Sequence, residues 1–168
     1  MPKGLKSTSS LITIGFAVSE SGANTFTQGQ VDLQLNPLDN EVFVVQAINL
    51  DPTNPDCTTG TNTSTDCSLT TTSRTAIANL SDSAALGVAK LAIRSDAVNA
   101  VGFSRMSMET PPAMLEYIGI IATNDFFVQI QGTGNAGAKS VSGKLYGYRA
   151  RADAAVYAAL VQSEVLSS

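Results

Sequence analysis

Alternation of apolar and polar residues dominates the chain and predicts β-strands. In SLITIGFAV, the residues Ile12, Ile14, Phe16 and Val18 fall on one face of an extended segment, because successive side chains of a strand point to opposite faces. The stretches TFTQGQVDLQL, FFVQIQ and KSVSGKLYGYRAR alternate in the same way, and segments rich in Gly, Pro and Asn separate them. Such segments form turns, so the sequence predicts many short strands joined by tight connections.

One stretch departs from simple alternation. EVFVVQAINL is apolar at consecutive positions from Val42 to Val45. A strand with apolar residues on both faces is typical of a position that is covered on both sides. We therefore expect a central strand here, buried on its two faces.

The segment SDSAALGVAKLAIRSD is ambiguous between helix and strand. Ser81 and Asp82 are good helix-capping residues, and the alanines that follow favour a helix. Gly87 disfavours a helix by about 1 kcal/mol relative to Ala. We predict a short helix near 82–90, followed by a strand through 91–94.

The C-terminal segment DAAVYAALVQSEVLSS predicts a helix, with Asp153 near its N-terminus, where a negative charge is favourable. The residues expected to share its apolar face are Ala154, Tyr157, Ala158, Val161 and Val165. Because β-branched valines recur in this segment, a strand remains the alternative.

Together these elements predict a single all-β domain over residues 1–168, mainly antiparallel, with a β-sandwich of jelly-roll-like architecture and a short C-terminal helix. We expect an N-terminal arm over 1–10, a cysteine-containing loop over 51–67, and a C-terminal helix or extension over 152–168. Strand order, and hence jelly roll against another sandwich, cannot be read from alternation.

Composition excludes several functions. Charged residues are 14% of the chain, against about 25% in an average protein, and the net charge is −4. A negative chain is a poor nucleic-acid binder, and Lys3 and Lys6 form only a weak candidate contact for a genome. The chain has no His, which removes the commonest general base and zinc ligand. We predict neither an enzyme nor a cofactor.

No stretch of the sequence approaches the roughly 20 apolar residues of a transmembrane helix. The apolar stretch 11–18 is short, and Thr13 and Gly15 interrupt it, so it is a poor signal peptide. We expect the chain to act with its start intact.

The two cysteines of the chain, Cys57 and Cys67, lie in the polar stretch DPTNPDCTTGTNTSTDC. Their spacing is too long for a CxxC redox pair, and a structural zinc site needs about four Cys or His ligands. A Cys57–Cys67 disulfide that closes a surface loop is the preferred interpretation, with two free thiols as the alternative. A disulfide would persist in an oxidising setting.

The same stretch offers oxygen ligands that suit calcium, although their spacing does not match an EF-hand loop. The weak metal candidates are Asp51, Asn54, Asp56 and Asp66. Because Asx residues are also common in loops for local hydrogen bonding, we predict no metal site.

EVFVVQAINL and NDFFVQIQGTGNAGAKSVSGKLYGYRA look like inner strands joined by variable surface loops, and in this the chain resembles the small coat proteins of icosahedral viruses, many of which are single jelly rolls. The resemblance implies a self-assembling capsid subunit in the virion, whose partners are copies of itself and other capsid proteins. The long basic arm usual in that family is missing. The alternative is an extracellular binding or adhesion module that recognises a ligand through its polar loops.

Overall fold

The computed structural model describes residues 2–167, which form ten β-strands, one short 3-10 helix and one α-helix. In chain order these elements are β1 (Leu5–Ser7), β2 (Ile12–Ser19), β3 (Thr27–Asp32), η1 (Pro37–Asp39), β4 (Glu41–Pro52), β5 (Thr63–Thr70), β6 (Ala85–Ser95), β7 (Ala100–Met106), β8 (Gly119–Ile121), β9 (Asp125–Thr133), β10 (Ser140–Ala152) and α1 (Ala154–Leu166). All strand pairs are antiparallel. The predicted all-β class and the C-terminal helix are confirmed.

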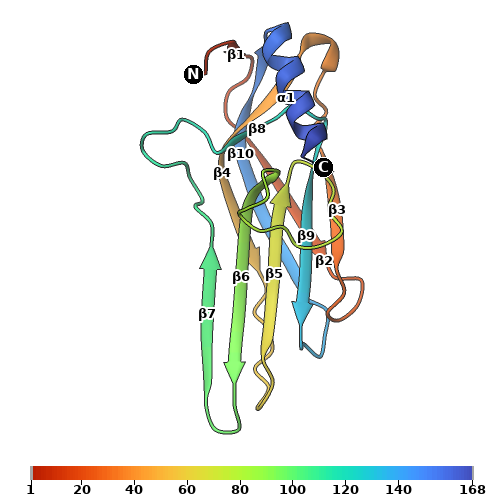
Figure 1. The fold of residues 1–168 in the computed structure, drawn as a ribbon, viewed down its shortest axis with the longest axis vertical. Coiled ribbons are helices and arrows are strands. Elements are labelled where there is room, and N and C mark those ends of the chain that lie inside the picture. The colour runs from red at the N-terminus through yellow and green to blue at the C-terminus, as the bar shows by residue number, and fades with distance from the viewer. Residues whose placement is uncertain (1, 168) are drawn as a thin grey trace.

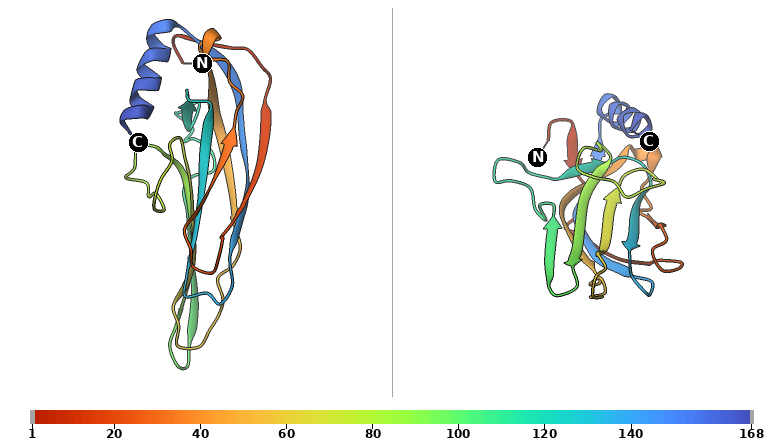
Figure 2. Two further views of the ribbon diagram at one scale, coloured as in Figure 1. Left: turned by 90° about the vertical axis from the view of Figure 1, so that its right-hand side faces the viewer. Right: turned by 60° about the horizontal axis from the view of Figure 1, so that its bottom comes forward.

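The described strands form two five-stranded sheets that face each other as a sandwich (Figures 1 and 2). In the first sheet, β10 lies between β4 and the two N-terminal strands β1 and β2, and β8 pairs with β4; the second sheet has the order β3-β9-β5-β6-β7. With β1 and β7 set aside, four strands remain in each sheet, in the orders β2-β10-β4-β8 and β3-β9-β5-β6. This is the strand order of a jelly roll.

The main core lies between the two sheets. Phe16 on β2 meets Phe126 on β9 edge-to-face, with 5.7 Å between ring centroids, a geometry that aromatic pairs prefer. The largest side chains that are fully buried, Phe43, Phe126 and Leu69 among them, come from both sheets. Their alternation with polar residues along each strand is the pattern that the sequence shows.

The start of β4 is buried on both faces, as its sequence predicts. Phe43 and Val45 belong to the core between the sheets. Val42 and Val44, which alternate with them, belong to a second cluster that includes side chains of α1. The helix therefore packs against the side of β4 that carries Val42 and Val44, and Figure 2 shows it at one end of the molecule.

Helix α1 begins where the sequence predicts, and Tyr157 and Val161 pack against the sheet as predicted, but the rest of its packed face differs. The side chain of Asp153 accepts a hydrogen bond of 2.9 Å from the backbone N–H of Val156 and so caps the helix. The side chains that face the sheet are Val156, Tyr157, Leu160, Val161 and Glu164. Ala154, Ala158 and Val165, predicted for the apolar face, are exposed.

The helix predicted near 82–90 is absent, because residues 85–95 form strand β6. Asp82 caps a turn instead, accepting a hydrogen bond from the backbone N–H of Ala84. A Cβ atom at Gly87 would lie 3.5 Å from the side chain of Ile48 on β4. The small residues of this segment thus allow the two sheets to approach, and this packing overrides the helix propensity of alanine.

The segment 71–84 crosses the outer face of the second sheet, in front of β5 and β9 (Figure 1). Beneath it lies the fully buried side chain of Gln129. Its amide accepts a hydrogen bond from the Ser68 hydroxyl and donates to the Thr70 hydroxyl, both at 2.7 Å, and donates to the Gln28 side chain at 3.0 Å. This network fixes the crossing segment, since the backbone N–H of Ala78 donates to the Ser68 hydroxyl.

Candidate functional site

Both cysteines are free, so the predicted Cys57–Cys67 disulfide is not formed. The predicted loop over 51–67 is also shorter than expected, because residues 63–67 belong to β5. Cys67 lies opposite Ala89 and Ile130 in the ladder and joins the buried core, whereas Cys57 is exposed in the preceding loop. Burial raises the pKa of the Cys67 thiol to about 12, which keeps it protonated and unreactive.

The weak metal candidates do not converge. Asp51 is exposed on β4 and Asn54 is exposed in the loop. Asp56 pairs with Lys139 at 2.6 Å, and Asp66 on β5 pairs with Lys90 at 3.2 Å. Within residues 2–167, no group of three or more Cys, Asp or Glu side chains is placed to hold a metal ion.

The polar loops at the Cys57 end of the sandwich bind one another. The side-chain amide of Asn24 donates to the backbone carbonyl of Asn135 at 2.8 Å and accepts from the backbone N–H of Asn135 at 2.9 Å. The buried carboxylate of Glu20 accepts from the backbone N–H groups of Gly132 and Lys139. Lys139 and the backbone N–H of Ala136 hydrogen-bond Asp56 and lower the pKa of its carboxyl group. Much of the polar character of these loops is therefore used within the fold.

The two N-terminal lysines do not lie on a free arm. Residues 5–7 form β1, which pairs with Ala150–Ala152 of β10, and they anchor the start of the chain to the first sheet. Lys3 and Lys6 are exposed on either side of the buried Leu5. Two exposed cations are a weak electrostatic signal on a negative chain.

The most unusual surface is the edge formed by β7. All seven residues of this strand are exposed. β7 pairs with β6 on one side, and no other described strand pairs with its outer edge. Figure 1 shows β7 as the outermost strand of its sheet, with the 107–118 segment projecting beyond it. An open edge of this kind is a template for pairing with another chain.

Exposed apolar side chains gather at the same edge. Seven of the large exposed hydrophobic residues among those described lie between residues 98 and 115: Val98, Val101, Phe103, Met106, Met108, Met114 and Leu115. Val101 and Phe103, in the middle of β7, are each 54% exposed, and Met114 is 94% exposed. Contiguous exposed apolar surface marks an interaction site in a folded protein. We call β7 together with residues 107–118 the exposed edge.

The outer face of β6 and β7 is basic. Lys90 lies directly opposite Arg105 in the ladder, and Arg94 lies four residues further along β6, opposite Val101. Phe103 sits between these two pairs on the same face. Lys90 pairs with Asp66, but no carboxylate within residues 2–167 forms an ion pair with Arg94 or Arg105. The face carries a local excess of positive charge on a chain of net charge −4.

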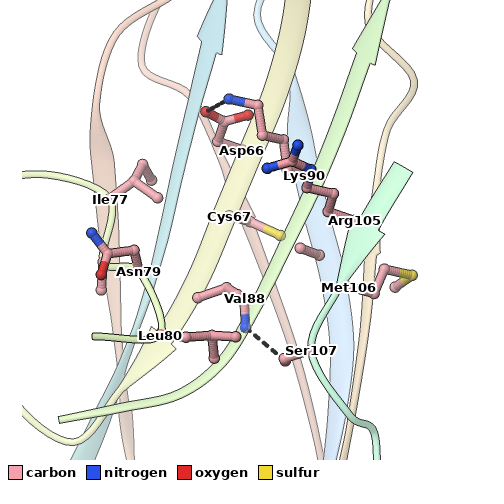
Figure 3. Close-up of a pocket in the computed structure, with 12 residues that line it drawn as sticks. Asp66, Cys67, Ile77, Asn79, Leu80, Val88, Lys90, Arg105, Met106 and Ser107 are labelled. Carbon is pink, nitrogen blue, oxygen red and sulfur yellow. Dashed lines mark hydrogen bonds and ion pairs between the residues drawn. The ribbon is translucent and has the colours of Figure 1, made fainter. Parts of the chain in front are cut away.

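A pocket of about 440 Å³ lies between the 77–80 segment and the outer face of β5, β6 and β7. Its lining is apolar along Ile77, Leu80 and Val88. Figure 3 shows the cationic side chains of Lys90 and Arg105 together at one end, with the Lys90–Asp66 ion pair beside them. The pocket therefore has an apolar wall and a cationic end.

Sequence reasoning did not find the exposed edge. The stretch GFSRMSM reads as an ordinary strand, and nothing in its alternation places it at the border of a sheet. The one available signal is the run of methionines and prolines in MSMETPPAML, since prolines end strands and large apolar residues in a loop have no core to enter.

No protein-family model matches the chain, and no curated protein matches it. No helix among the described residues is long and apolar enough to cross a lipid bilayer. The class supported by the fold is therefore a single-domain jelly-roll β-sandwich, and its function has to be argued from the surfaces described above.

Proposed function

We propose that this chain is a structural subunit that assembles with copies of itself into a shell, as a viral coat protein does. The jelly-roll strand order supports the proposal, because viral capsid domains are one of the groups built on it. The fold alone does not decide, since lectins and cupins share it. On this proposal the chain is not an enzyme, and it resides in the virion.

The exposed edge is the observation that carries the proposal. A monomer gains nothing by leaving a seven-residue edge strand unpaired beside several exposed apolar side chains, because such edges aggregate unless they are covered or blocked. Charged side chains, Pro and short length protect many natural edges, and β7 has seven residues, no Pro and a single charge, Arg105. An unpaired edge with exposed apolar side chains is expected of a strand that pairs with another chain.

The low charge of the chain also supports assembly. With 14% charged residues, copies repel one another weakly when they pack side by side. The polar loops of the Cys57 end, which are bound to one another through Asn24, Asn135 and Asp56, can stay at a free surface without needing a ligand.

The second candidate function is an extracellular binding module. The pocket beside Lys90 and Arg105 favours it, because an apolar cavity with a few convergent polar groups is the usual form of a ligand site. The interlocked polar loops weigh against recognition through those loops. A module of this type would remain monomeric and bind an anionic amphiphile in the pocket.

Light scattering after size-exclusion chromatography, with electron microscopy of the peak, tests the proposal. Oligomers or closed particles at physiological salt are expected. Replacing Phe103 with Ser should reduce assembly, whereas Leu38→Ser should not, because Leu38 is 93% exposed but lies on η1, far along the chain from the exposed edge. A wild-type chain that stays monomeric at high concentration contradicts the proposal.

A further inference from the structure

The hydrogen-bonding groups that β7 leaves free can be assigned from its ladder with β6. Two backbone bonds flank that ladder, Ser107 N–H to the Val88 carbonyl and Asp96 N–H to the Asn99 carbonyl, both at 2.9 Å. Because hydrogen-bonded and non-hydrogen-bonded pairs alternate in an antiparallel ladder, positions 101, 103 and 105 bond to β6. The N–H and C=O groups of positions 100, 102, 104 and 106 therefore point to the open edge.

We propose that β7 pairs antiparallel with β7 of a second copy of this chain, about a two-fold axis at Phe103. The second sheets of the two copies would then form one continuous sheet. The inference rests on the proposed function, since it names the contact through which assembly begins. Phe103 is the midpoint of Ala100–Met106. Centring the axis there pairs every residue of the strand with a residue of its copy.

The register makes the backbone groups complementary. Gly102 lies opposite Ser104 of the copy, and Ala100 lies opposite Met106. These four positions are the ones whose N–H and C=O groups point outward, so each pair exchanges both of its hydrogen bonds. A contact that is repeated by the two-fold axis needs this self-complementarity.

The side chains also fit this register. The two Phe103 rings become a cross-strand pair, which stabilises an antiparallel sheet. Val101 lies opposite Arg105 of the copy, so no two cations are directly opposed. Moving the axis to Arg105 would place two arginines face to face, which is destabilising. It would also leave the start of β7 without a partner.

The basic outer face sets the salt dependence of the contact. Arg94 is next to Val101 in the ladder, so Val101 of one copy separates Arg94 of that copy from Arg105 of the other. These cations are about 10 Å apart, two strand spacings, which is close to the Debye length at 0.1 M salt. Physiological salt therefore screens their repulsion, and association should strengthen as salt is added from low ionic strength.

Engineered cysteines test the register. In a Cys57→Ser background, Phe103→Cys should form an intermolecular disulfide under mild oxidation, because the Cα atoms of a non-hydrogen-bonded pair are about 4.5 Å apart. Val101→Cys is the matched control, since Val101 has the same exposure and lies on the same face of β7. Its copies would be about 14 Å apart, four residues along the strand. The double variant Val101→Cys/Arg105→Cys should cross-link again.

Ser104→Pro is the complementary variant, since it removes an outward N–H that β6 does not use, and proline is tolerated at such edge positions. It should abolish the dimer and leave the unfolding midpoint equal to that of the wild-type monomer, measured at a concentration at which the wild type is dissociated. Non-reducing gels, intact-mass spectrometry and light scattering read these outcomes. If the wild type assembles but Phe103→Cys does not cross-link, or Val101→Cys cross-links equally well, the register is wrong and the proposed function stands. A monomeric wild type overturns both.

Discussion

The carboxylate of Glu164 accepts a hydrogen bond of 2.7 Å from the backbone N–H of Ala122, which directly follows β8. A second oxygen of the same carboxylate accepts from the backbone N–H of Thr123 at 2.9 Å. The side chain is buried, and burial raises its pKa. One acidic residue thus holds the end of α1 against the first sheet.

We expect Glu164 to make stability depend on pH. Because its pKa is raised in the folded state, the folded chain binds the proton more tightly than the unfolded chain, and stability falls as pH rises above about 4.5, the ordinary value, toward the raised value. Glu164→Gln removes this dependence. Urea unfolding of both chains between pH 4 and pH 7 should show a difference in free energy of unfolding that favours the wild type most at the acidic end. A constant difference would contradict the assignment.

Removing Gln129 should destabilise the fold. Gln129→Leu keeps an apolar stem of similar size but leaves the buried Ser68 hydroxyl without its acceptor beneath the 71–84 segment, whereas Thr70 still donates to the Thr72 carbonyl. One buried group left unpaired costs about 1–3 kcal/mol, so we expect a loss of about 1–3 kcal/mol in the free energy of unfolding, measured in urea. Gln131→Leu on the same strand provides the control, because no hydrogen bond of the Gln131 side chain contributes to this network.

The two thiols should differ in reactivity. Cys57 is exposed and Cys67 is buried with its pKa raised to about 12, and the thiolate is the reactive form. An alkylating reagent should therefore add one label to the native protein, at Cys57, and two in denaturant. Intact-mass analysis after brief labelling reads the result. A native protein that takes no label, and whose mass is two hydrogen atoms below that of the dithiol form, would instead support a Cys57–Cys67 disulfide.

Two glycines should respond to alanine with opposite signs. A Cβ atom at Gly147 would collide with the Val44 carbonyl oxygen and lie 2.5 Å from the Phe43 ring. Overpacking of this kind costs about 1–3 kcal/mol. Gly15 on β2 has no atom within 4 Å of such a Cβ, so Gly15→Ala should raise stability by about 0.5–1 kcal/mol, because alanine loses less entropy on folding. Thermal or urea unfolding of the two variants compares them directly.

The sequence was a good guide wherever one face of a strand meets the core. Alternation around Phe16, Phe126 and Leu145 identified strands whose inner residues fill the sandwich, and the apolar run from Val42 to Val45 correctly indicated burial on both faces. Period-2 patterns record which side of a strand is buried, and that information is local.

What the sequence did not reveal depends on non-local pairing. The alanines around Gly87 indicated a helix, yet the segment pairs with β5 and β7, and Gly87 lies beside Ile48, a residue far along the chain. Cys57 and Cys67 are close in sequence, yet β5 turns one of them into the core. The sequence did not predict the exposed edge for the same reason. Strand order decides whether a second strand lies beside Phe103, and alternation carries no information on strand order.

Strand β7 lies between β6 and β8 in the chain and, like β1, outside the eight strands that make the jelly roll. The buried residues of the main core, from Leu33 to Leu145, include none from β7. Substitutions of the exposed side chains of that strand therefore remove no contact of the main core. On the proposed function, folding and association depend on separate parts of one small chain, and a change of neighbour requires new sequence in only one hairpin.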